Sequence, residues 1–368
     1  MNQRVYMLIW GMFFFFFNFS LLSAKEKGFR YKSSDQIVLN GKLALPDGLL
    51  AKNVKKVVIL IHGSGPQNMD MNLTRITKKK VTNKVFCDVR DALLKKGFAV
   101  LRYNKRSYEW RKILIKNRLA MQKKSFKAFF KNPLKYFIDD VKSMISLAKK
   151  HFPKAKIYLL GFSQGTYVAL QVAHSDKRVA GVALVGFYTV PLLVISFEQL
   201  VYRPLYFLCR LDKNHDGYLV LSELKKAGKV GMQLAIQMRV LDANQDGKLS
   251  FMEIQAGNLI NLHKFQKKLI SHTLQELRNP AVYEILQQSK FKVLFFQGLW
   301  DNQTPAYHAL SIRISAKFLW LKKNMRFFFF PKLGHILDKR DRYDDVYFSP
   351  IDKKALSKMM NQMNLFFQ

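Results

Sequence analysis

The apolar and polar positions of this 368-residue chain follow two alternating periods. Loose alternation that ends at a Pro predicts a strand at 38–45. Short, mostly apolar runs predict strands at 56–62, 97–103, 157–161, 179–185, 292–296 and 326–330. Apolar residues spaced three and four positions apart predict helices, most clearly at 137–150, 166–173 and 352–367. Short apolar strands that alternate with helices predict an α/β fold, with a mostly parallel sheet covered by helices on both faces.

The interval 187–290 interrupts this alternation. Its pattern predicts helices and two acidic loops, with no strand of the main sheet. We therefore expect a core in two parts, 25–186 and 291–368, and an all-helical insertion between them. Residues 1–24 form a separate segment at the N-terminus.

That N-terminal segment has the pattern of an export signal. Arg4 precedes an uncharged run over 5–24, which contains five consecutive phenylalanines at 13–17 and ends in small residues. A charged start, an apolar centre and a small-residue end are typical of a secretory signal peptide. Twenty uncharged residues also suffice to span a bilayer if they are not cleaved. We expect a secreted or periplasmic protein, with a membrane anchor through 5–24 as the alternative.

The charge balance is strongly positive, since 62 Lys+Arg against 25 Asp+Glu give a net charge of +37. A content of 49% hydrophobic residues excludes wholesale disorder, and two cysteines exclude a disulfide framework. Basic and aromatic residues interleave over 105–135. A solvated helical surface is the simpler interpretation, and contact with anionic lipid or the cell envelope is the functional alternative. No nucleic-acid-binding motif accompanies the stretch, so nucleic acid is not an expected partner.

One short motif carries a candidate nucleophile. The sequence Gly161-Phe162-Ser163-Gln164-Gly165 fits G-x-S-x-G and lies between a predicted strand and a predicted helix. Glycines permit a turn sharp enough to expose the Ser163 hydroxyl, with the N–H groups of the next helix directed at it. The alternative is a tight strand–helix turn with an inactive serine.

A second glycine-containing turn, at 62–66, reads His-Gly-Ser-Gly-Pro and follows the strand at 56–62. Such a turn lets backbone N–H groups approach a carbonyl oxygen that becomes an anion. We expect the N–H groups of Ser64 and Gln164 to be the two donors, and His62 to have a structural role.

Four motifs in order resemble the α/β-hydrolases, and within them the bacterial dienelactone-hydrolase-like group. They are Gly41-Lys-Leu-Ala-Leu-Pro46, the turn at 62–66, Arg102-Tyr-Asn-Lys-Arg-Ser107 and the motif around Ser163. Asn104 and Ser107 stand where family members have Asp and Gly. The resemblance covers about 35–185 and 290–368.

The resemblance also implies the rest of a catalytic triad. Asp301, in Gly298-Leu-Trp-Asp-Asn-Gln-Thr-Pro305, maps onto the family's acid. His335, in Leu333-Gly-His-Ile-Leu337, maps onto the family's histidine. His335 would then be the general base for Ser163, and Asp301 would orient its ring. His308 is the rival base, poorly directed from a helix.

The insertion contains two twelve-residue acidic loops, at 212–223 and 242–253, which resemble calmodulin-type EF-hands over about 200–265. Ca²⁺ takes about seven oxygens, and a Gly at position 6 turns each loop around it. The expected ligands of the first loop are Asp212, Asn214, Asp216, Tyr218 and Glu223. Those of the second are Asp242, Asn244, Asp246, Lys248, Ser250 and Glu253. Tyr218 and Lys248 would use their backbone carbonyls, and Leu219 would pair with Leu249.

These features predict a secreted or envelope-associated serine hydrolase. Its substrate would be a small carboxylic ester or thioester, cleaved through an acyl-enzyme intermediate. Two Ca²⁺ ions would stabilise the insertion as a lid, and the chemistry itself would need no cofactor. Peptide cleavage is the weaker chemical alternative. The alternative from another class is a calcium-binding scaffold or binding protein on a hydrolase fold without turnover.

Overall fold

The computed structural model describes residues 26–33, 35–77, 81–263, 266–317, 323–345 and 347–368. The export or anchor segment expected at 1–24 lies outside these residues. Within them, no helix is both long enough and apolar enough to cross a bilayer.

Eight strands form one mixed sheet in the order β1-β2-β4-β3-β5-β6-β9-β10. Their bounds are β1 Glu26–Lys32, β2 Val38–Ala44, β3 Lys56–Ile61, β4 Ala99–Tyr103, β5 Lys156–Phe162, β6 Val179–Val185, β9 Lys292–Gly298 and β10 Met325–Phe330. The pairs from β4 to β10 are parallel, whereas β1–β2 and β2–β4 are antiparallel. All seven expected strands are confirmed. The edge strand β1 was not predicted from its own residues, because its side chains are largely polar and exposed.

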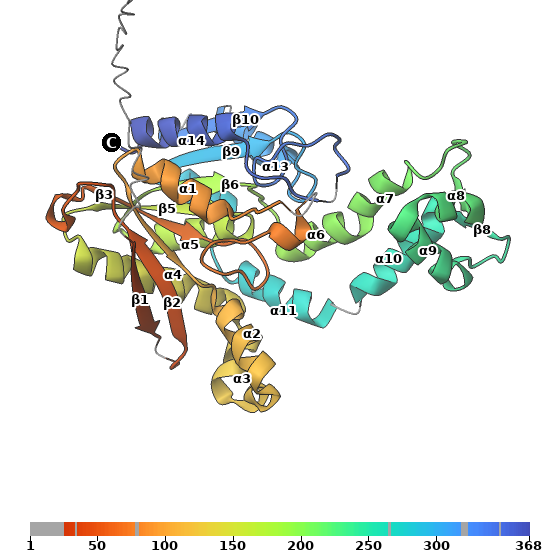
Figure 1. The fold of residues 1–368 in the computed structure, drawn as a ribbon, viewed down its shortest axis with the longest axis horizontal. Coiled ribbons are helices and arrows are strands. Elements are labelled where there is room, and N and C mark those ends of the chain that lie inside the picture. The colour runs from red at the N-terminus through yellow and green to blue at the C-terminus, as the bar shows by residue number, and fades with distance from the viewer. Residues whose placement is uncertain (1–25, 34, 78–80, 264–265, 318–322, 346) are drawn as a thin grey trace, which may run out of the picture.

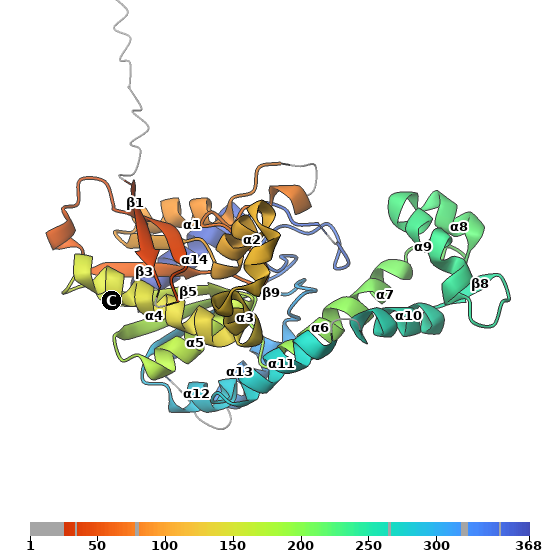
Figure 2. The same cartoon turned by 90° about the horizontal axis from the view of Figure 1, so that it is seen from below.

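Helices cover both faces of this sheet (Figures 1 and 2). One face packs against α1 (Val85–Leu94) and α14 (Lys353–Phe366). The other packs against α4, α5, α12 and α13, which are Pro133–His151, Gln164–Ser175, Val282–Gln288 and Tyr307–Ser315. The middle strands are therefore buried on both sides, which is why their sequences are continuous apolar runs.

A helical excursion follows β4 and extends beside β2 and α4 (Figure 2). It consists of α2 (Arg106–Lys116), the 3₁₀ turn η4 (Arg118–Gln122) and α3 (Lys124–Lys131). Two shorter 3₁₀ turns lie elsewhere, at Ala51–Asn53 and Thr74–Ile76. The basic stretch at 105–135 was expected to form a solvated helical surface. This expectation is wrong for the first two basic residues of the stretch. Lys105 and Arg106 are only 5% and 2% exposed.

The insertion between β6 and β9 has two unlike parts. Near the core lie α6, the π-helical turn η5, α11 and α12, of which the first three are Leu192–Phe197, Glu198–Tyr202 and Gln266–Leu277. Farther out lie α7, β7, α8, α9, β8 and α10, which are Arg203–Leu208, Tyr218–Val220, Leu221–Lys226, Gly228–Leu241, Lys248–Ser250 and Phe251–His263. Both views show α8, α9 and β8 beyond the ends of α7 and α10, away from the sheet (Figures 1 and 2).

The two acidic loops, together with β7, α8, α9 and β8, are called the acidic-loop lobe below. Leu219 pairs with Leu249 in an antiparallel β7–β8 ladder, as the sequence predicted. This ladder is a departure from the expected all-helical insertion. The position of the lobe is a second departure, because a lobe that projects from the core does not itself cover the site at the sheet edge.

Candidate active site at the ends of β5, β9 and β10

The turn between β5 and α5 holds Ser163 in a strained backbone conformation, with φ 52° and ψ −123°. A non-glycine residue rarely adopts this region, and such strain concentrates at functional sites. Close backbone contacts enforce the turn. A Cβ on Gly161 would lie 2.3 Å from the carbonyl oxygen of Gly165, and one on Gly165 would lie 2.4 Å from that of Ile61. Both glycines of the motif are therefore required by space.

The expected acid and histidine are in contact. Asp301 lies in the loop after β9 and His335 in the loop after β10. The Nδ1 atom of His335 lies 2.9 Å from Oδ2 and 3.1 Å from Oδ1 of Asp301. Asp301 is fully buried and His335 is almost fully buried. The pair is thus shielded from water on the side of Nδ1.

Several donors hold the Asp301 carboxylate in its charged form. Its Oδ1 accepts the backbone N–H groups of Gln303 and Thr304, each at 2.9 Å. Its Oδ2 accepts the Gln297 amide at 2.9 Å and the Thr304 hydroxyl at 2.8 Å. Burial alone would raise the pKa of Asp301, but His335 and these backbone donors hold it below its ordinary value.

Gln297 and Thr304 had not been singled out from the sequence. The signal for Gln297 was an amide at the end of the apolar strand K-V-L-F-F. A polar side chain in such a strand needs a partner when it is buried, and here that partner is Asp301.

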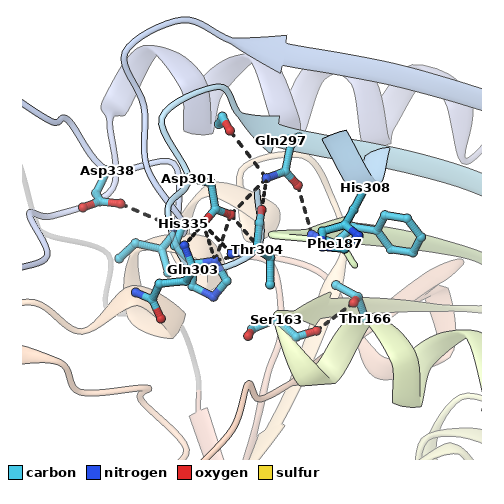
Figure 3. Close-up of polar contacts among 12 residues, drawn as sticks. Ser163, Thr166, Phe187, Gln297, Asp301, Gln303, Thr304, His308, His335 and Asp338 are labelled. Atoms are coloured by element: carbon cyan, nitrogen blue, oxygen red, sulfur yellow. Dashed lines mark hydrogen bonds and ion pairs between the residues drawn. The ribbon is translucent and has the colours of Figure 1, made fainter. Parts of the chain in front are cut away.

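Ser163 and His335 face each other across the end of β6. The Ser163 N–H donates to the Val185 carbonyl at 2.9 Å, and the next residue, Gly186, lies directly against the His335 ring. In Figure 3 the Ser163 side chain lies on the side of the ring away from Asp301. In the described part of the chain, no hydrogen bond joins the Ser163 hydroxyl to His335. A longer separation is common in a free enzyme, because such contacts tighten when substrate binds.

The two expected oxyanion donors flank this serine. Gln164 is the first residue of α5, and a first-turn N–H has no partner within its own helix. Ser64 follows Gly63, where an added Cβ would lie 3.1 Å from the Ser163 Cβ. The turn at 62–66 therefore passes directly beside the serine.

The sequence interpretation did not predict the role of Lys105. Its ammonium donates to the Gly63 carbonyl at 2.6 Å and to the Gln164 side-chain oxygen at 2.8 Å, and it lies 4.3 Å from the Phe137 ring centre. Burial lowers the pKa of Lys105 to about 7. The sequence feature that could have indicated this role is the place of Lys105 within the motif Arg102–Ser107.

Asp140, on α4, is a charged residue that the apolar spacing at 137–150 does not mark as buried. In the structure it is buried and forms an ion pair with Arg106, which also binds Asp35 on its other side. The helix pattern alone could not reveal this partner, because Arg106 comes from a different segment.

The remaining histidines of interest do not join the site. His62 is buried, and its Nε2 atom lies 2.9 Å from the Asn68 carbonyl, which agrees with the structural role expected for it. His308 is fully buried, 3.1 Å from the Thr189 hydroxyl and 3.4 Å from Glu198. Asp301 contacts His335 and not His308, so the acid expected from the sequence pairs with His335.

In the first acidic loop, backbone N–H groups bind the side chains of the first and last residues, Asp212 and Glu223. The Gly217 N–H donates to Oδ2 of Asp212 at 3.0 Å. The two oxygens of Glu223 accept the N–H groups of Lys213 at 2.8 Å and Val220 at 3.1 Å. The other Asp212 oxygen is buried without a hydrogen-bond partner. An unpartnered carboxylate oxygen of this kind fits a cation.

The second loop repeats the N–H contacts of its first aspartate and last glutamate, but the Oδ1 atom of Asp242 accepts the Asp246 N–H at 3.2 Å. Glu253 accepts the N–H groups of Ala243 at 2.8 Å and Ser250 at 2.9 Å, and Asp242 accepts that of Gly247 at 3.0 Å. Across the described ranges, no three Asp, Glu, His or Cys side chains converge as a preformed metal cluster. The carboxylates of each loop are instead held by N–H groups of the same loop.

Comparison with known proteins agrees with this architecture. Residues 56–208 match the family model of the alpha/beta hydrolase fold. Esterase EstD from Thermotoga maritima is 28% identical over 164 residues, which is 45% of this chain and 34% of that protein. The chain thus spans about a third of the length of this curated relative. The family match and the sheet order give the chain an α/β-hydrolase fold.

Solved structures also match the chain at low identity. Est1E from Butyrivibrio proteoclasticus is 15% identical with a TM-score of 0.49, over 94% of this chain and 99% of that one. Dienelactone hydrolase from Anabaena variabilis is 14% identical with a TM-score of 0.43, over 94% of this chain and 97% of that one.

Proposed function

We propose that this α/β-hydrolase-fold protein is a serine hydrolase that cleaves carboxylic esters or thioesters of small molecules. The observation that carries the proposal is the contact between Asp301 and His335 beside the strained turn of Ser163. Strain at a serine turn, a buried carboxylate–histidine pair and free backbone N–H groups together supply what acyl transfer requires. The relative from Thermotoga maritima is named an esterase, which supports the same reaction class.

Each group has a definite task in the proposed reaction. His335 takes the proton of the Ser163 hydroxyl as the oxygen attacks the substrate carbonyl carbon. The N–H groups of Ser64 and Gln164 stabilise the resulting oxyanion. His335 then returns the proton to the leaving alcohol or thiol, and water releases the acyl group by the same steps in reverse order. Asp301 holds the proton of His335 on Nδ1 throughout.

The direct test is hydrolysis of short-chain p-nitrophenyl esters by the full chain and by Ser163→Ala. The proposal expects turnover in the first protein and a residual rate at least about 10³-fold lower in the second. Equal rates in the two proteins would reject Ser163 as the nucleophile.

We further propose that each acidic loop binds one Ca²⁺ ion. The residues that would hold the ions are the eleven ligands named from the sequence. The fit rests on the unpartnered oxygen of Asp212 and on the N–H donors that already fix Asp212, Asp242 and both glutamates. Because the acidic-loop lobe projects from the core, calcium would stabilise this lobe and would leave turnover unchanged.

Contact with anionic lipid is proposed for the excursion α2–η4–α3. Its tip exposes Ile115 and Leu119 at 74% and 69%, along with Met121 and Phe130. Lysine and arginine residues flank these apolar residues in the sequence, most of them exposed. An apolar tip framed by positive charge matches the interface of a bilayer that contains anionic lipids. The export pattern of residues 1–24 supports a secreted or periplasmic location, or an envelope anchor.

A second candidate function is a calcium-binding protein that docks a partner without turnover. The observation that favours it lies in the outer part of the insertion, where a cavity of about 400 Å³ is lined by α7, α9 and α10. Ile236, which lines the cavity, is 74% exposed, and Val240, later on α9, is 86% exposed. Ester hydrolysis that is lost in Ser163→Ala would decide for the enzyme.

A further inference from the structure

A buried chain of polar side chains runs from the turn at 62–66 to helix α11 of the insertion. Lys105 donates to the Gly63 carbonyl at 2.6 Å and to the Gln164 side chain at 2.8 Å. The Gln164 Nε2 atom lies 3.1 Å from Nε2 of His272, whose Nδ1 lies 3.6 Å from Glu276. All four side chains are less than 9% exposed. None of them belongs to the triad.

The chemistry of the groups fixes the direction of the hydrogen bonds on either side of the Gln164 amide. A lysine ammonium can only donate, so Gln164 turns its oxygen to Lys105 and its NH₂ to His272. The His272 Nε2 atom must then be an unprotonated acceptor, and its ring proton sits on Nδ1, facing Glu276. Glu276 also accepts the Leu192 N–H of α6 at 2.8 Å. The chain therefore ends on two helices of the insertion.

Lys105 contacts groups that are covalently joined to both expected oxyanion donors. The Gly63 carbonyl and the Ser64 N–H belong to one planar trans peptide and point in opposite directions. Fixing the Gly63 oxygen on Lys105 therefore fixes the direction of the Ser64 N–H. Gln164 carries the second donor on its own backbone. One ammonium thus holds the residues of both donors.

Burial of this lysine is costly, and no carboxylate offsets the cost. Within the described ranges Lys105 forms no salt bridge, and its contacts are a carbonyl, an amide oxygen and the Phe137 ring. An uncompensated buried charge lowers stability, whereas a methionine of similar length would fill the same space without that cost. Stability alone therefore does not account for a lysine here.

We propose that Lys105 is a positioning residue for the oxyanion donors. His272 couples the position of α11 to Lys105 through Gln164. This inference rests on the serine hydrolase function proposed above. The insertion would then act on the site through Gln164, even though the acidic-loop lobe lies away from it.

The test compares Lys105→Met with a matched control, Lys56→Met. Lys56 also lies 4.3 Å from a phenylalanine ring, that of Phe98, and bonds an amide oxygen of Asn364 at 2.8 Å, far from the site. With a p-nitrophenyl ester, Lys105→Met should lower kcat by about 10- to 100-fold and change KM by less than about twofold, because only transition-state binding is weakened. Lys56→Met should keep kcat within about twofold of the wild type.

Gln164→Leu supplies a second variant, since it removes the links to Lys105 and His272 and keeps the backbone N–H. The losses in Lys105→Met and Gln164→Leu should not add in the double variant, because both break the same chain. Additive losses would show independent roles and overturn the proposal.

A readout without turnover separates this proposal from the proposed function. Hydrogen exchange of the peptide that covers 62–67 should speed up in Lys105→Met and in His272→Leu, and stay unchanged in Lys56→Met. Unchanged exchange and unchanged kcat in Lys105→Met would overturn the positioning role. If the variants exchange faster but the wild type cleaves no ester, Lys105 would still hold the turn at 62–66. The hydrolase function would then be rejected.

Discussion

The Nδ1 atom of His335 lies 2.9 Å from the Oδ2 atom of Asp301, although the residues are 34 positions apart. Their strands explain the contact. β9 and β10 are parallel neighbours, with Gly298 paired to Phe330, so the loops that follow both strands leave the same edge of the sheet. Ser163 leaves the same edge two strands away, because β5 is separated from β9 by β6. Parallel strands thus bring three distant segments to one place.

Replacing Asp301 by asparagine should abolish most turnover without unfolding the protein. The amide keeps the volume, but its NH₂ group disfavours a proton on the facing Nδ1 atom of His335. We expect kcat to fall on the order of 10³- to 10⁴-fold near neutral pH. The measurement is ester hydrolysis beside a melting curve, with Asp352→Asn at the start of α14 as the control. A variant with near-normal kcat would show that Asp301 is not the orienting acid.

The free energy of unfolding should depend on pH in a way that reveals the lowered pKa of the buried Lys105. Its pKa is about 7 in the folded protein and 10.5 in a solvated lysine, so the unfolded chain binds more protons between those values. Stability should therefore rise with pH from about 7 to 10.5, with this residue adding a slope of up to about 1.4 kcal/mol per pH unit.

Urea unfolding of the wild type and Lys105→Met across pH 7.5–9.5 measures this contribution. As pH rises, the free energy of unfolding of the wild type should increase relative to that of Lys105→Met. Parallel pH profiles would contradict the lowered pKa of Lys105.

Most of the fold followed from sequence pattern. Buried strands such as Val179–Val185 are recognised by a continuous apolar run. The glycines around Ser163 are recognised because the turn has no space for a Cβ at either position. The antiparallel edge strand β1 carries no continuous apolar run, because one edge and most of its side chains face water.

The supporting part of the site was not predictable in the same way. Lys105, Gln164 and His272 come from three segments that meet only in the folded chain. Single-sequence patterns report which face of an element is buried, and they do not report which polar groups meet there. The same limit explains Asp140, whose partner Arg106 lies 34 positions earlier.

Calcium should raise the melting temperature. At a free concentration about 100 times the dissociation constant, each site adds about 2.7 kcal/mol to the free energy of unfolding. We expect dissociation constants on the order of 10⁻⁶ to 10⁻³ M, suited to a calcium-replete exterior. Melting curves with calcium and with chelator, for the wild type and for Glu223→Gln plus Glu253→Gln, measure the effect. A calcium-independent midpoint in the wild type would reject binding, and calcium-dependent turnover would reject a purely stabilising role.

Vesicles that contain anionic lipid should retain the protein through the α2–α3 excursion. We expect co-sedimentation with phosphatidylcholine–phosphatidylglycerol vesicles, weaker binding at high salt and little binding to phosphatidylcholine alone. Ile115→Asp plus Leu119→Asp should reduce binding several-fold, whereas Leu50→Asp, at another exposed apolar residue, should not. Equal binding by both variants would place the lipid contact elsewhere.

The central claim is that Ser163 is a nucleophile activated by His335 and Asp301. Its most direct measurement is labelling by a fluorophosphonate probe, followed by mass spectrometry of the modified peptide. The account predicts one phosphonyl group on Ser163 in the wild type, slow labelling of His335→Ala and none of Ser163→Ala. Folded wild-type protein that stays unlabelled, or that is labelled equally well in Ser163→Ala, would contradict it.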